Sequence, residues 1–295
     1  MKKLLILSGK GGTGKTTIAT SFADLSHAKA VADCDVDAPN LHLMSKFKTE
    51  PIISDFIGSK KAKIDANTCI GCNQCLQHCR FHSIDVVDGK CQINEYACEG
   101  CGVCELVCPV HAITLEDDVA GEQQLYLSDC VFSSAKLKMG RGNSGKLVSE
   151  VKKSLFANTD AELAIIDGSP GIGCPVIASM SGVDLVLIVA EPSMSGISDL
   201  TRLVHTAKTL HVVVAVCVNK FDISLENTEQ IVEFCKENDI PFMGMIPYDA
   251  KAKEAMELKT SLVQMDSVAS ASIQEIFDHT LALLGEVENK KIGGY

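Results

Sequence analysis

A glycine-rich segment near the start of the chain has the residue types and the spacing that phosphate binding needs. Residues 8–17 read SGKGGTGKTT and fit the pattern G-x-x-x-x-G-K-[ST], with Lys15 and Thr16 in its last two positions. Glycines let consecutive backbone N–H groups face a phosphate, a lysine supplies positive charge, and a threonine hydroxyl can bind Mg²⁺. An apolar run precedes the segment and a helix-like stretch, 17–25, follows it. The sequence therefore predicts a nucleoside triphosphate site, with contacts from Gly9, Gly11, Gly12, Thr13, Gly14, Lys15, Thr16 and Thr17.

Eight of the fourteen cysteines fall in two runs that both read C-x₂-C-x₂-C-x₃-C. The first run is Cys69, Cys72, Cys75 and Cys79, and the second is Cys98, Cys101, Cys104 and Cys108. This spacing resembles that of bacterial two-cluster ferredoxins, in which the fourth cysteine of each run binds the other cluster. The resemblance implies two [4Fe–4S] clusters, one bound by Cys69, Cys72, Cys75 and Cys108 and the other by Cys98, Cys101, Cys104 and Cys79. Zinc is the competing metal, but zinc sites usually present two separated C-x₂-C pairs.

The cysteine-rich segment is also an internal repeat. Ile84 and Ile113 follow the fourth cysteine of their runs at the same distance, and Asp88-Gly89 predicts a hairpin between the halves. Arg80 stands where a proline usually follows the fourth cysteine, a departure that removes no ligand. Cys91 lies outside both runs, and we interpret it as structural.

Aspartates at the ends of two apolar stretches have the chemistry that phosphoryl transfer requires. Asp33 ends the stretch 29–33 and is followed by Asp35, and Asp167 ends the stretch 163–167 before a GSPGIG loop. Carboxylates at strand ends can hold Mg²⁺-bound water and orient an attacking water. Turn formation and helix capping are the alternative for Asp33 and Asp35, and our interpretation for Asp37.

The composition excludes several classes of protein. No apolar run is long enough to span a bilayer, and the opening MKKLLIL is interrupted too early for an export signal. The cysteines therefore indicate metal sites in a reducing cytoplasm rather than disulfides. A formal net charge of −11 argues against tight binding to nucleic acid. The segment 60–118 contains five Lys or Arg and nine Asp or Glu, which suits a basic redox partner.

The rest of the sequence predicts an α/β fold. Near-continuous Val, Ile and Leu indicate strands buried on both faces, and hence a mostly parallel sheet flanked by helices. The expected strands are 29–33, 124–131, 163–167, 184–190, 212–218 and 240–246. The expected helices are one ending at Ala157, then 198–210, 225–238, 250–258 and 273–288, before a loose tail, 290–295. Residues 140–146 match G-x-G-x-x-G without an expected strand directly before them, and we interpret them as a mobile interface loop.

Lys10 narrows the interpretation of the phosphate loop. K-G-G-T-G-K-T resembles the deviant Walker A loop of the MinD/ParA/Mrp superfamily of P-loop ATPases (SIMIBI class), which is related to the nitrogenase iron protein. The resemblance covers essentially the whole chain and implies slow ATP hydrolysis to ADP and phosphate. It further implies a homodimer that closes on ATP, in which Lys10 reaches the partner's nucleotide. A solvated loop lysine is the alternative.

The same resemblance assigns roles to individual residues. Asp35 would orient the attacking water, Asp33 would be its metal-side partner, and Asp167 would act on Mg²⁺ through water. The implied catalytic residues are thus Lys10, Lys15, Asp35 and Asp33, with Thr16 and Asp167 at Mg²⁺. Asn219-Lys220-Phe221-Asp222 resembles the guanine-reading NKxD of GTPases, but in this superfamily such an asparagine contacts adenine, with Pro247 on the other wall. ATP is therefore the expected nucleotide and GTP the alternative.

These observations predict two domains. A discontinuous P-loop ATPase domain would comprise 1–59 and 119–295, and a small α+β ferredoxin domain, 60–118, would be inserted after its second strand. We favour ATP-driven homodimer closure coupled to electron transfer through the clusters toward a redox partner. The alternatives are an iron–sulfur carrier or assembly factor of Mrp type, which would serve an acceptor protein, and a MinD-like switch with redox-sensing clusters. No cysteine follows Cys235, which weakens the carrier, and the tail lacks the apolar face of a membrane anchor.

A third, subunit-bridging cluster is a further alternative. Cys174 follows Asp167 at the offset of a cluster cysteine in the nitrogenase iron protein, but residues 140–145 contain no second cysteine to match it. We therefore interpret Cys174 as a packing or local redox residue.

Overall fold

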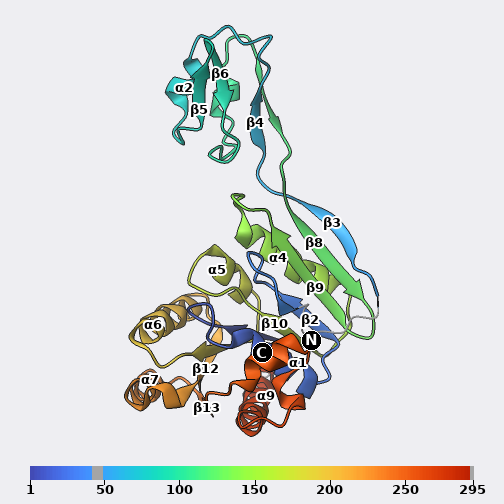
Figure 1. The fold of residues 1–295 in the computed structure, drawn as a ribbon, viewed down its shortest axis with the longest axis vertical. Coiled ribbons are helices and arrows are strands. Elements are labelled where there is room, and N and C mark those ends of the chain that lie inside the picture. Colours follow the sequence, from blue (N-terminus) through green and yellow to red (C-terminus); the bar gives the residue numbers. More distant parts are fainter. Residues whose placement is uncertain (42–48, 293–295) are drawn as a thin grey trace. The chain divides into compact units, whose positions relative to one another are not determined.

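The computed structural model describes residues 1–41 and 49–292, and these form two compact units. The first unit comprises Met1–Ile53, Gln123–Lys136 and Ser144–Tyr295, and the second comprises Ser54–Glu122 and Leu137–Asn143. The chain therefore leaves the first unit once after β2 and once more after β9, as the colours of Figure 1 allow the reader to follow.

A parallel sheet forms the centre of the first unit, as predicted. Strands β13-β12-β11-β1-β10-β2-β9 are neighbours in this order and run parallel, and β8 and β3 continue the sheet. Their bounds are β1 (Lys2–Leu7), β2 (Ala30–Asp33), β3 (Ile52–Ile57), β8 (Val119–Leu127), β9 (Val131–Leu137), β10 (Leu163–Asp167), β11 (Leu185–Ala190), β12 (Val213–Asn219) and β13 (Phe242–Ile246). Strands β2 and β11 are buried at every residue, because apolar side chains point to both faces and helices cover both.

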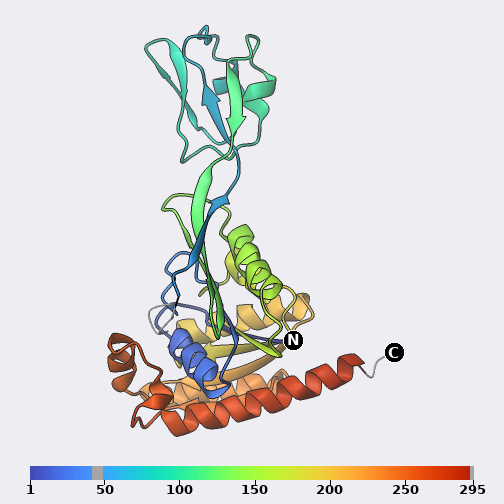
Figure 2. The same ribbon diagram turned by 90° about the vertical axis from the view of Figure 1, so that its right-hand side faces the viewer.

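Helices cover the two faces of this sheet (Figure 2). On one face α1 (Lys15–Leu25) and α9 (Ser270–Ile292) pack together, and Phe22 meets Phe277 edge to face with ring centroids 5.1 Å apart. Such a pair contributes about 0.5–1.5 kcal/mol beyond its burial. The other face carries α4 (Ser144–Ala157), α5 (Cys174–Met180), α6 (Met194–Thr209) and α7 (Leu225–Glu237). The short α8 (Lys251–Glu257) precedes α9. Within the described residues, no helix is long and apolar enough to cross a membrane.

Three predictions about elements were wrong. The expected strand 124–131 is two strands, β8 and β9, separated by a turn in which the Ser128 hydroxyl donates to the Cys130 carbonyl at 3.0 Å. Because β9 ends at Leu137, a strand does lead into residues 140–146. Helix α9 continues to Ile292, so residues 290–292 belong to this helix and not to the expected loose tail. Residues 293–295 lie outside the described part.

The second unit is built from two antiparallel strand pairs. Strand β4 (Lys61–Ile64) pairs with β7 (Ile113–Glu116). Strands β5 (Ile84–Val87) and β6 (Lys90–Ile93) form the predicted hairpin, in which Asp88 and Gly89 both have positive φ, 50° and 76°. Two short helices, α2 (Gln74–His78) and α3 (Val103–Leu106), begin inside the cysteine runs. The core of this unit consists largely of cysteines with Ile84, Ile113 and Ala112.

The loop after β9 is fixed to the second unit through Arg141. Its guanidinium lies 2.9 Å from Glu95 and 3.2 Å from Asp118, and it stacks over the Tyr96 ring at 4.9 Å. Asn143 also donates to the Ser59 hydroxyl at 2.9 Å. Residues 140–143 of the segment that we interpreted as an interface loop thus belong to this unit, whereas residues 144–146 begin α4 of the first unit.

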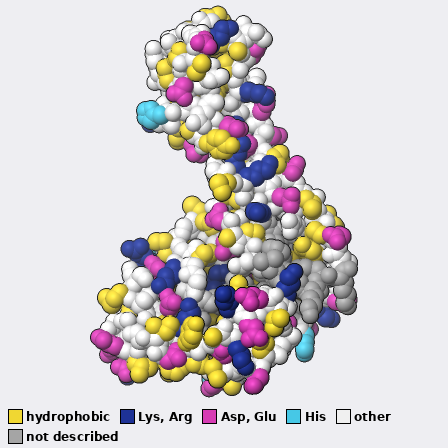
Figure 3. Space-filling model, in the orientation of Figure 1, with side chains coloured by type: hydrophobic (Ala, Val, Ile, Leu, Met, Phe, Trp, Pro, Cys, Tyr) yellow, Lys and Arg dark blue, Asp and Glu magenta, His cyan; other side chains and the backbone are white. Residues whose placement is uncertain are grey.

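Apolar side chains are exposed on the second unit, and Figure 3 shows some of them in yellow. Ile70 is 65% and Leu106 is 85% exposed, and both belong to or follow the cysteine runs. Both side chains are thus exposed and lie next to the cysteine runs in the sequence.

Candidate nucleotide site and cysteine-lined cavities

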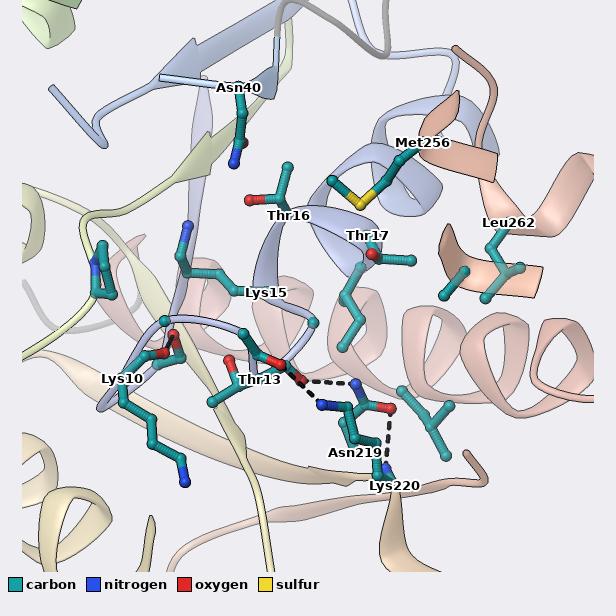
Figure 4. A pocket seen from close by; sticks show the side chains of 18 of the residues that line it. Lys10, Thr13, Lys15, Thr16, Thr17, Asn40, Asn219, Lys220, Met256 and Leu262 are labelled. Carbon is teal, nitrogen blue, oxygen red and sulfur yellow. Dashed lines mark hydrogen bonds between the residues drawn. The ribbon is translucent and has the colours of Figure 1, made fainter. Parts of the chain in front are cut away.

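A cleft of about 640 Å³ lies at the carboxyl ends of the parallel strands of the first unit. The segments that follow β1, β2, β10, β12 and β13 all contribute to its lining. Ligands of open α/β sheets bind at this edge, and the volume is typical of a small-molecule site. Figure 4 shows the cleft with the phosphate loop in its lower part and Met256 and Leu262 at the opposite end.

The cleft brings together most of the predicted nucleotide contacts. These lining residues are Lys10, Gly11, Gly12, Thr13, Gly14, Lys15, Thr16, Thr17, Asp35, Asn219 and Pro247. Gly9, Asp33 and Asp167 lie behind the described lining. A Cβ on Gly9 would lie 2.2 Å from the Cβ of Asp199 in α6, so glycine is required there by helix packing.

Gly14 and Asn219 fit together only because Gly14 lacks a side chain. Gly14 has φ 95°, and a Cβ there would lie 2.2 Å from Asn219 Nδ2. Asn219 Nδ2 in turn donates to the Thr13 carbonyl at 2.6 Å, as the dashed lines in Figure 4 indicate. The phosphate loop is thereby joined to the end of β12.

Lys15 and Thr16 share one acidic partner at the bottom of the loop. Lys15 Nζ lies 2.5 Å from Asp167 Oδ1, and the Thr16 hydroxyl donates to Asp167 Oδ2 at 2.7 Å. The lysine is 5% exposed and the aspartate is fully buried. Burial opposes the charged form of Lys15, but the charge of Asp167 prevails and raises its pKa. Lys15, the Thr16 hydroxyl and the strand-end carboxylate of Asp167 therefore lie together at the place where the family resemblance implies phosphate and Mg²⁺.

Asp33 organises the loop that follows β2. Its carboxylate accepts from the backbone N–H groups of Asp35 at 3.0 Å, Asn40 at 3.0 Å and Leu41 at 2.9 Å. Burial, and then the charge of Asp167, raise the pKa of Asp33 to about 7. These contacts match turn formation, which was the alternative interpretation of Asp33. They also hold the loop in which Asp35 lines the cleft.

Asp35, like Asp37, lines the cleft from this loop. Burial raises its pKa, and the charge of Lys15 opposes that change. The neighbouring Cys34 is fully buried, and its carbonyl accepts from the Ser169 hydroxyl at 2.5 Å. The loops after β2 and β10 are therefore bonded to each other beside the cleft.

The last residue of the NKxD-like segment, Asp222, makes a structural contact. The Asp222 carboxylate accepts from the backbone N–H of Tyr248 at 2.8 Å, and the described lining does not include Asp222. Tyr248 and Pro247 do line the cleft. Asp222 thus positions the wall that follows β13.

The Lys10 side chain makes its contacts within its own chain. Its Nζ lies 2.5 Å from Glu191 Oε2 and 3.2 Å from the Ser193 hydroxyl. Lys220 Nζ lies 3.2 Å from Glu191 Oε1 and donates to the Gly12 carbonyl at 2.8 Å. Burial would raise the pKa of Glu191, but hydrogen bonds and charge from both lysines lower it. Figure 4 shows Lys10 extending away from Thr16 and Met256.

Sequence reasoning missed Glu191, Lys220 and Asn40 as parts of the site. Asn40 points into the cleft in Figure 4, and its Oδ1 is a buried acceptor that has no hydrogen-bond partner among the residues that the structure describes. The hydroxyl of Thr13 is in the same situation. Unpaired buried polar atoms that line one cleft are typical of groups that bind a polar ligand. Asn40 could have been found from its place in the aspartate-rich loop after β2.

Two small cavities in the second unit are lined by the cysteine runs. The first is lined by Cys69, Cys72, Cys75, Cys91 and Cys108. The second is lined by Cys79, Cys98, Cys101 and Cys104. Each cavity therefore receives three cysteines of one run and the fourth cysteine of the other. The remaining lining is mostly apolar.

The thiols surround these cavities rather than converge on one point. Within the described residues, no three Cys, His, Asp or Glu side chains are placed to hold a single metal ion. Four thiols spread around a cavity fit a multi-iron cluster, in which each thiolate binds a different iron, better than one tetrahedral ion. Cys174, outside these cavities, is exposed at the start of α5, where its carbonyl lies 3.2 Å from a Cβ built on Gly145.

Comparison with known proteins identifies the family. Residues 4–262 match the model of the CobQ/CobB/MinD/ParA nucleotide binding domain. The chain belongs to this family. Its phosphate loop is accordingly a nucleotide-binding site of a MinD/ParA-type P-loop NTPase. The fold agrees, because the MinD protein of Pyrococcus horikoshii, solved with Mg-ADP, superposes with a TM-score of 0.58. That match is 17% identical and covers 97% of this chain and 98% of the other.

Relatives with two kinds of name resemble nearly the whole chain in sequence. The uncharacterized protein MJ0578 of Methanocaldococcus jannaschii is 34% identical over 281 residues, which is 94% of this chain and 95% of that protein. An iron-sulfur cluster carrier protein of Pyrococcus abyssi is 23% identical and covers 97% of this chain and 88% of its own length.

Proposed function

We propose that the chain is an ATP-hydrolysing iron–sulfur protein in which ATP-driven homodimer closure is coupled to electron transfer through two [4Fe–4S] clusters. The observation that carries the proposal is the pairing of a phosphate loop with two cavities that each receive four predicted ligand cysteines. The ATPase domain would be 1–59 and 119–295, and the ferredoxin-like insertion 60–118.

The nucleotide chemistry follows from the cleft. The phosphate loop and Lys15 would bind the phosphates, and Thr16 and Asp167 would hold Mg²⁺ directly and through water. Because Thr16 and Lys15 are bonded to Asp167, nucleotide binding exchanges these contacts for contacts to phosphate and metal. Asp35 would orient the attacking water, and Lys10 of one protomer would reach the nucleotide of the other. Asn219, Pro247 and Tyr248 would contact the adenine.

The cluster ligands follow from the two cavities. Cys69, Cys72, Cys75 and Cys108 would hold one cluster, and Cys98, Cys101, Cys104 and Cys79 the other. Bound clusters would supply one-electron transfer. The residues fit, because Cys75, Cys98 and Cys108 are each less than a tenth exposed and the walls are mostly apolar.

Metal analysis tests the clusters directly. Protein purified without oxygen should contain iron and acid-labile sulfide for two [4Fe–4S] clusters and give a low-temperature EPR signal after reduction. One tightly bound zinc, or reduced protein without an EPR signal, would refute the clusters. Cys79→Ala should damage the cluster otherwise bound by Cys98, Cys101 and Cys104. Loss confined to the first cavity would refute the assignment.

Cluster delivery is the second candidate, because relatives that cover the whole chain are named iron-sulfur cluster carriers. The two functions differ in what happens to iron during ATP hydrolysis. A carrier transfers its iron and sulfide to an apoprotein, whereas an electron-transfer protein retains them. Incubation of iron-labelled protein with ATP and an apo-ferredoxin, followed by separation, distinguishes the two.

A further inference from the structure

Five cysteines, rather than four, line the first cavity. The fifth is Cys91 of β6, whose side chain is 3% exposed. Its thiol donates to Asn73 Oδ1 at 3.4 Å, and Asn73 lies between the predicted ligands Cys72 and Cys75. Cys91 therefore lines the same cavity as the four predicted ligands, and our interpretation of it as purely structural does not account for this position.

The internal repeat shows that the second cavity lacks this thiol. One constant offset relates Cys69 to Cys98 and β4 to β6, and on that offset Cys91 corresponds to Ala62. The strand pairings repeat as well: Ala62 faces Leu115, and Cys91 faces Val86. Ala62 lines the second cavity as Cys91 lines the first. At this matched position the first cavity has the thiol of Cys91 and the second has the methyl group of Ala62.

Of the four predicted ligands in the first cavity, Cys75 is the best exchange partner for Cys91. Cys69 and Cys72 are less buried, and the Cys108 sulfur already accepts from the Ala112 backbone N–H at 3.2 Å. Cys75 and Cys91 are both buried, and the Cys91 thiol donates to Asn73, two residues before Cys75. Transfer of an iron–sulfur bond from Cys75 to Cys91 therefore needs no approach of solvent.

We propose that Cys91 is a reserve ligand of the first cluster site, which can replace Cys75. The inference rests on the proposed cluster function. In the exchange one iron–sulfur bond to Cys75 breaks and one to Cys91 forms, while the Cys91 proton passes to Cys75. No electron is transferred, and no other reactant is needed. The first site can thus release and regain a ligand, whereas the second site, with Ala62, cannot.

Matched alanine variants of the two cavities test the proposal. Cys75→Ala and Cys104→Ala remove corresponding ligands of the two runs, and Cys75→Ala/Cys91→Ala removes the reserve as well. Each protein is purified without oxygen, and iron, sulfide and the EPR spectrum of the reduced protein are measured. Nucleotide binding by the first unit reports that each variant is folded.

The expected result is an asymmetry between the cavities. Cys75→Ala should keep the full iron and sulfide of the wild type, whereas Cys104→Ala and the double variant should each keep half. Cys75→Ala with half the iron would overturn the proposal, and so would a double variant with full iron, because retention would not then depend on Cys91. Wild-type protein with zinc and no sulfide would refute the clusters themselves, a failure visible without any variant.

Discussion

Lys10 Nζ lies 2.5 Å from Glu191 Oε2 of the same chain, although the family resemblance implies that this lysine contacts the nucleotide of a partner chain. The lysine side chain is 35% exposed and that of Glu191 19%, so the pair is partly screened and contributes roughly 0.2–1 kcal/mol. In the proposed homodimer, Lys10 would have to leave this ion pair to reach the partner's nucleotide. Lys220 can take over part of the charge of Glu191, because it already lies 3.2 Å from the other carboxylate oxygen.

Lys10→Ala should abolish most ATP hydrolysis and leave nucleotide binding nearly unchanged. A cation supplied by a partner offsets charge that develops in the transition state, and an arginine in that role is worth about 10³–10⁵ in rate. Steady-state phosphate release and nucleotide affinity measure the two effects. Mixing Lys10→Ala with inactive Asp35→Ala should restore activity, because one composite site then has both residues. Heterodimers without any activity would contradict a role across the interface.

Glu191→Gln should favour the ATP-bound homodimer. Loss of the ion pair frees Lys10, and the energy of two partly exposed pairs, one in each chain of the dimer, corresponds to a roughly 2- to 30-fold lower dissociation constant of the dimer. Light scattering with a non-hydrolysable ATP analogue measures this constant. Glu150→Gln, which removes an exposed ion pair with Lys153 on α4, is the matched control and should have no effect. If the Glu191→Gln dimer were unchanged or weaker, the Lys10–Glu191 ion pair would not oppose dimerisation.

ATP should bind more tightly than GTP, and Asp222→Asn should leave this preference unchanged. The Asp222 carboxylate accepts from the Tyr248 backbone N–H and is outside the described cleft lining, so it is not free to read a base. Competition binding with ATP, GTP and xanthosine triphosphate tests both statements. If Asp222→Asn gained affinity for xanthosine triphosphate, or GTP displaced ATP, Asp222 would be a guanine reader.

Lys152→Met should destabilise the first unit, and the loss should grow with pH. Lys152 Nζ donates to three carbonyls at the end of α5, at 2.5–2.9 Å, and leaving a buried carbonyl unpaired costs about 1–3 kcal/mol. Burial lowers the pKa of Lys152 to about 8 from 10.5. Between these values the folded state binds fewer protons than the unfolded state, so wild-type stability rises with pH. Urea unfolding from pH 7 to 10.5 should show a widening difference; a constant one would exclude Lys152 as the titrating group.

Nucleotide state and cluster state should influence each other if closure is coupled to electron transfer. Linkage requires that a shift of cluster potential by ATP be matched by an equal change of nucleotide affinity on reduction. Anaerobic redox titrations without nucleotide, with ADP and with a non-hydrolysable ATP analogue give the first quantity, and binding to oxidised and reduced protein gives the second. If neither changes, the isolated protein is uncoupled, and cluster delivery becomes the better account.

The sequence predicted best what depends on neighbours along the chain. The phosphate loop, the parallel strands and the Asp88-Gly89 hairpin are set by local patterns, and the structure has them where expected. The Lys10–Glu191 pair and the anchoring of Arg141 to Glu95 join residues far apart in sequence, and no local pattern encodes them. Asp33 illustrates the same limit, because its role depends on which backbone N–H groups the folded loop turns toward it.

The exchange of fourth cysteines between the halves affects how the protein can be made. Cys79 lines the second cavity and Cys108 the first, so on the ribosome neither ligand set is complete until nearly the whole of Ser54–Glu122 has emerged. The parallel sheet is finished later still, because β10 lies between β1 and β2. Both proposed cluster sites would therefore become available together, on a nascent chain whose nucleotide site does not yet exist. Ribosome-bound chains arrested between β9 and β10 should accordingly accept iron and sulfide while failing to bind ATP, and the opposite result would mean that the sheet must form first.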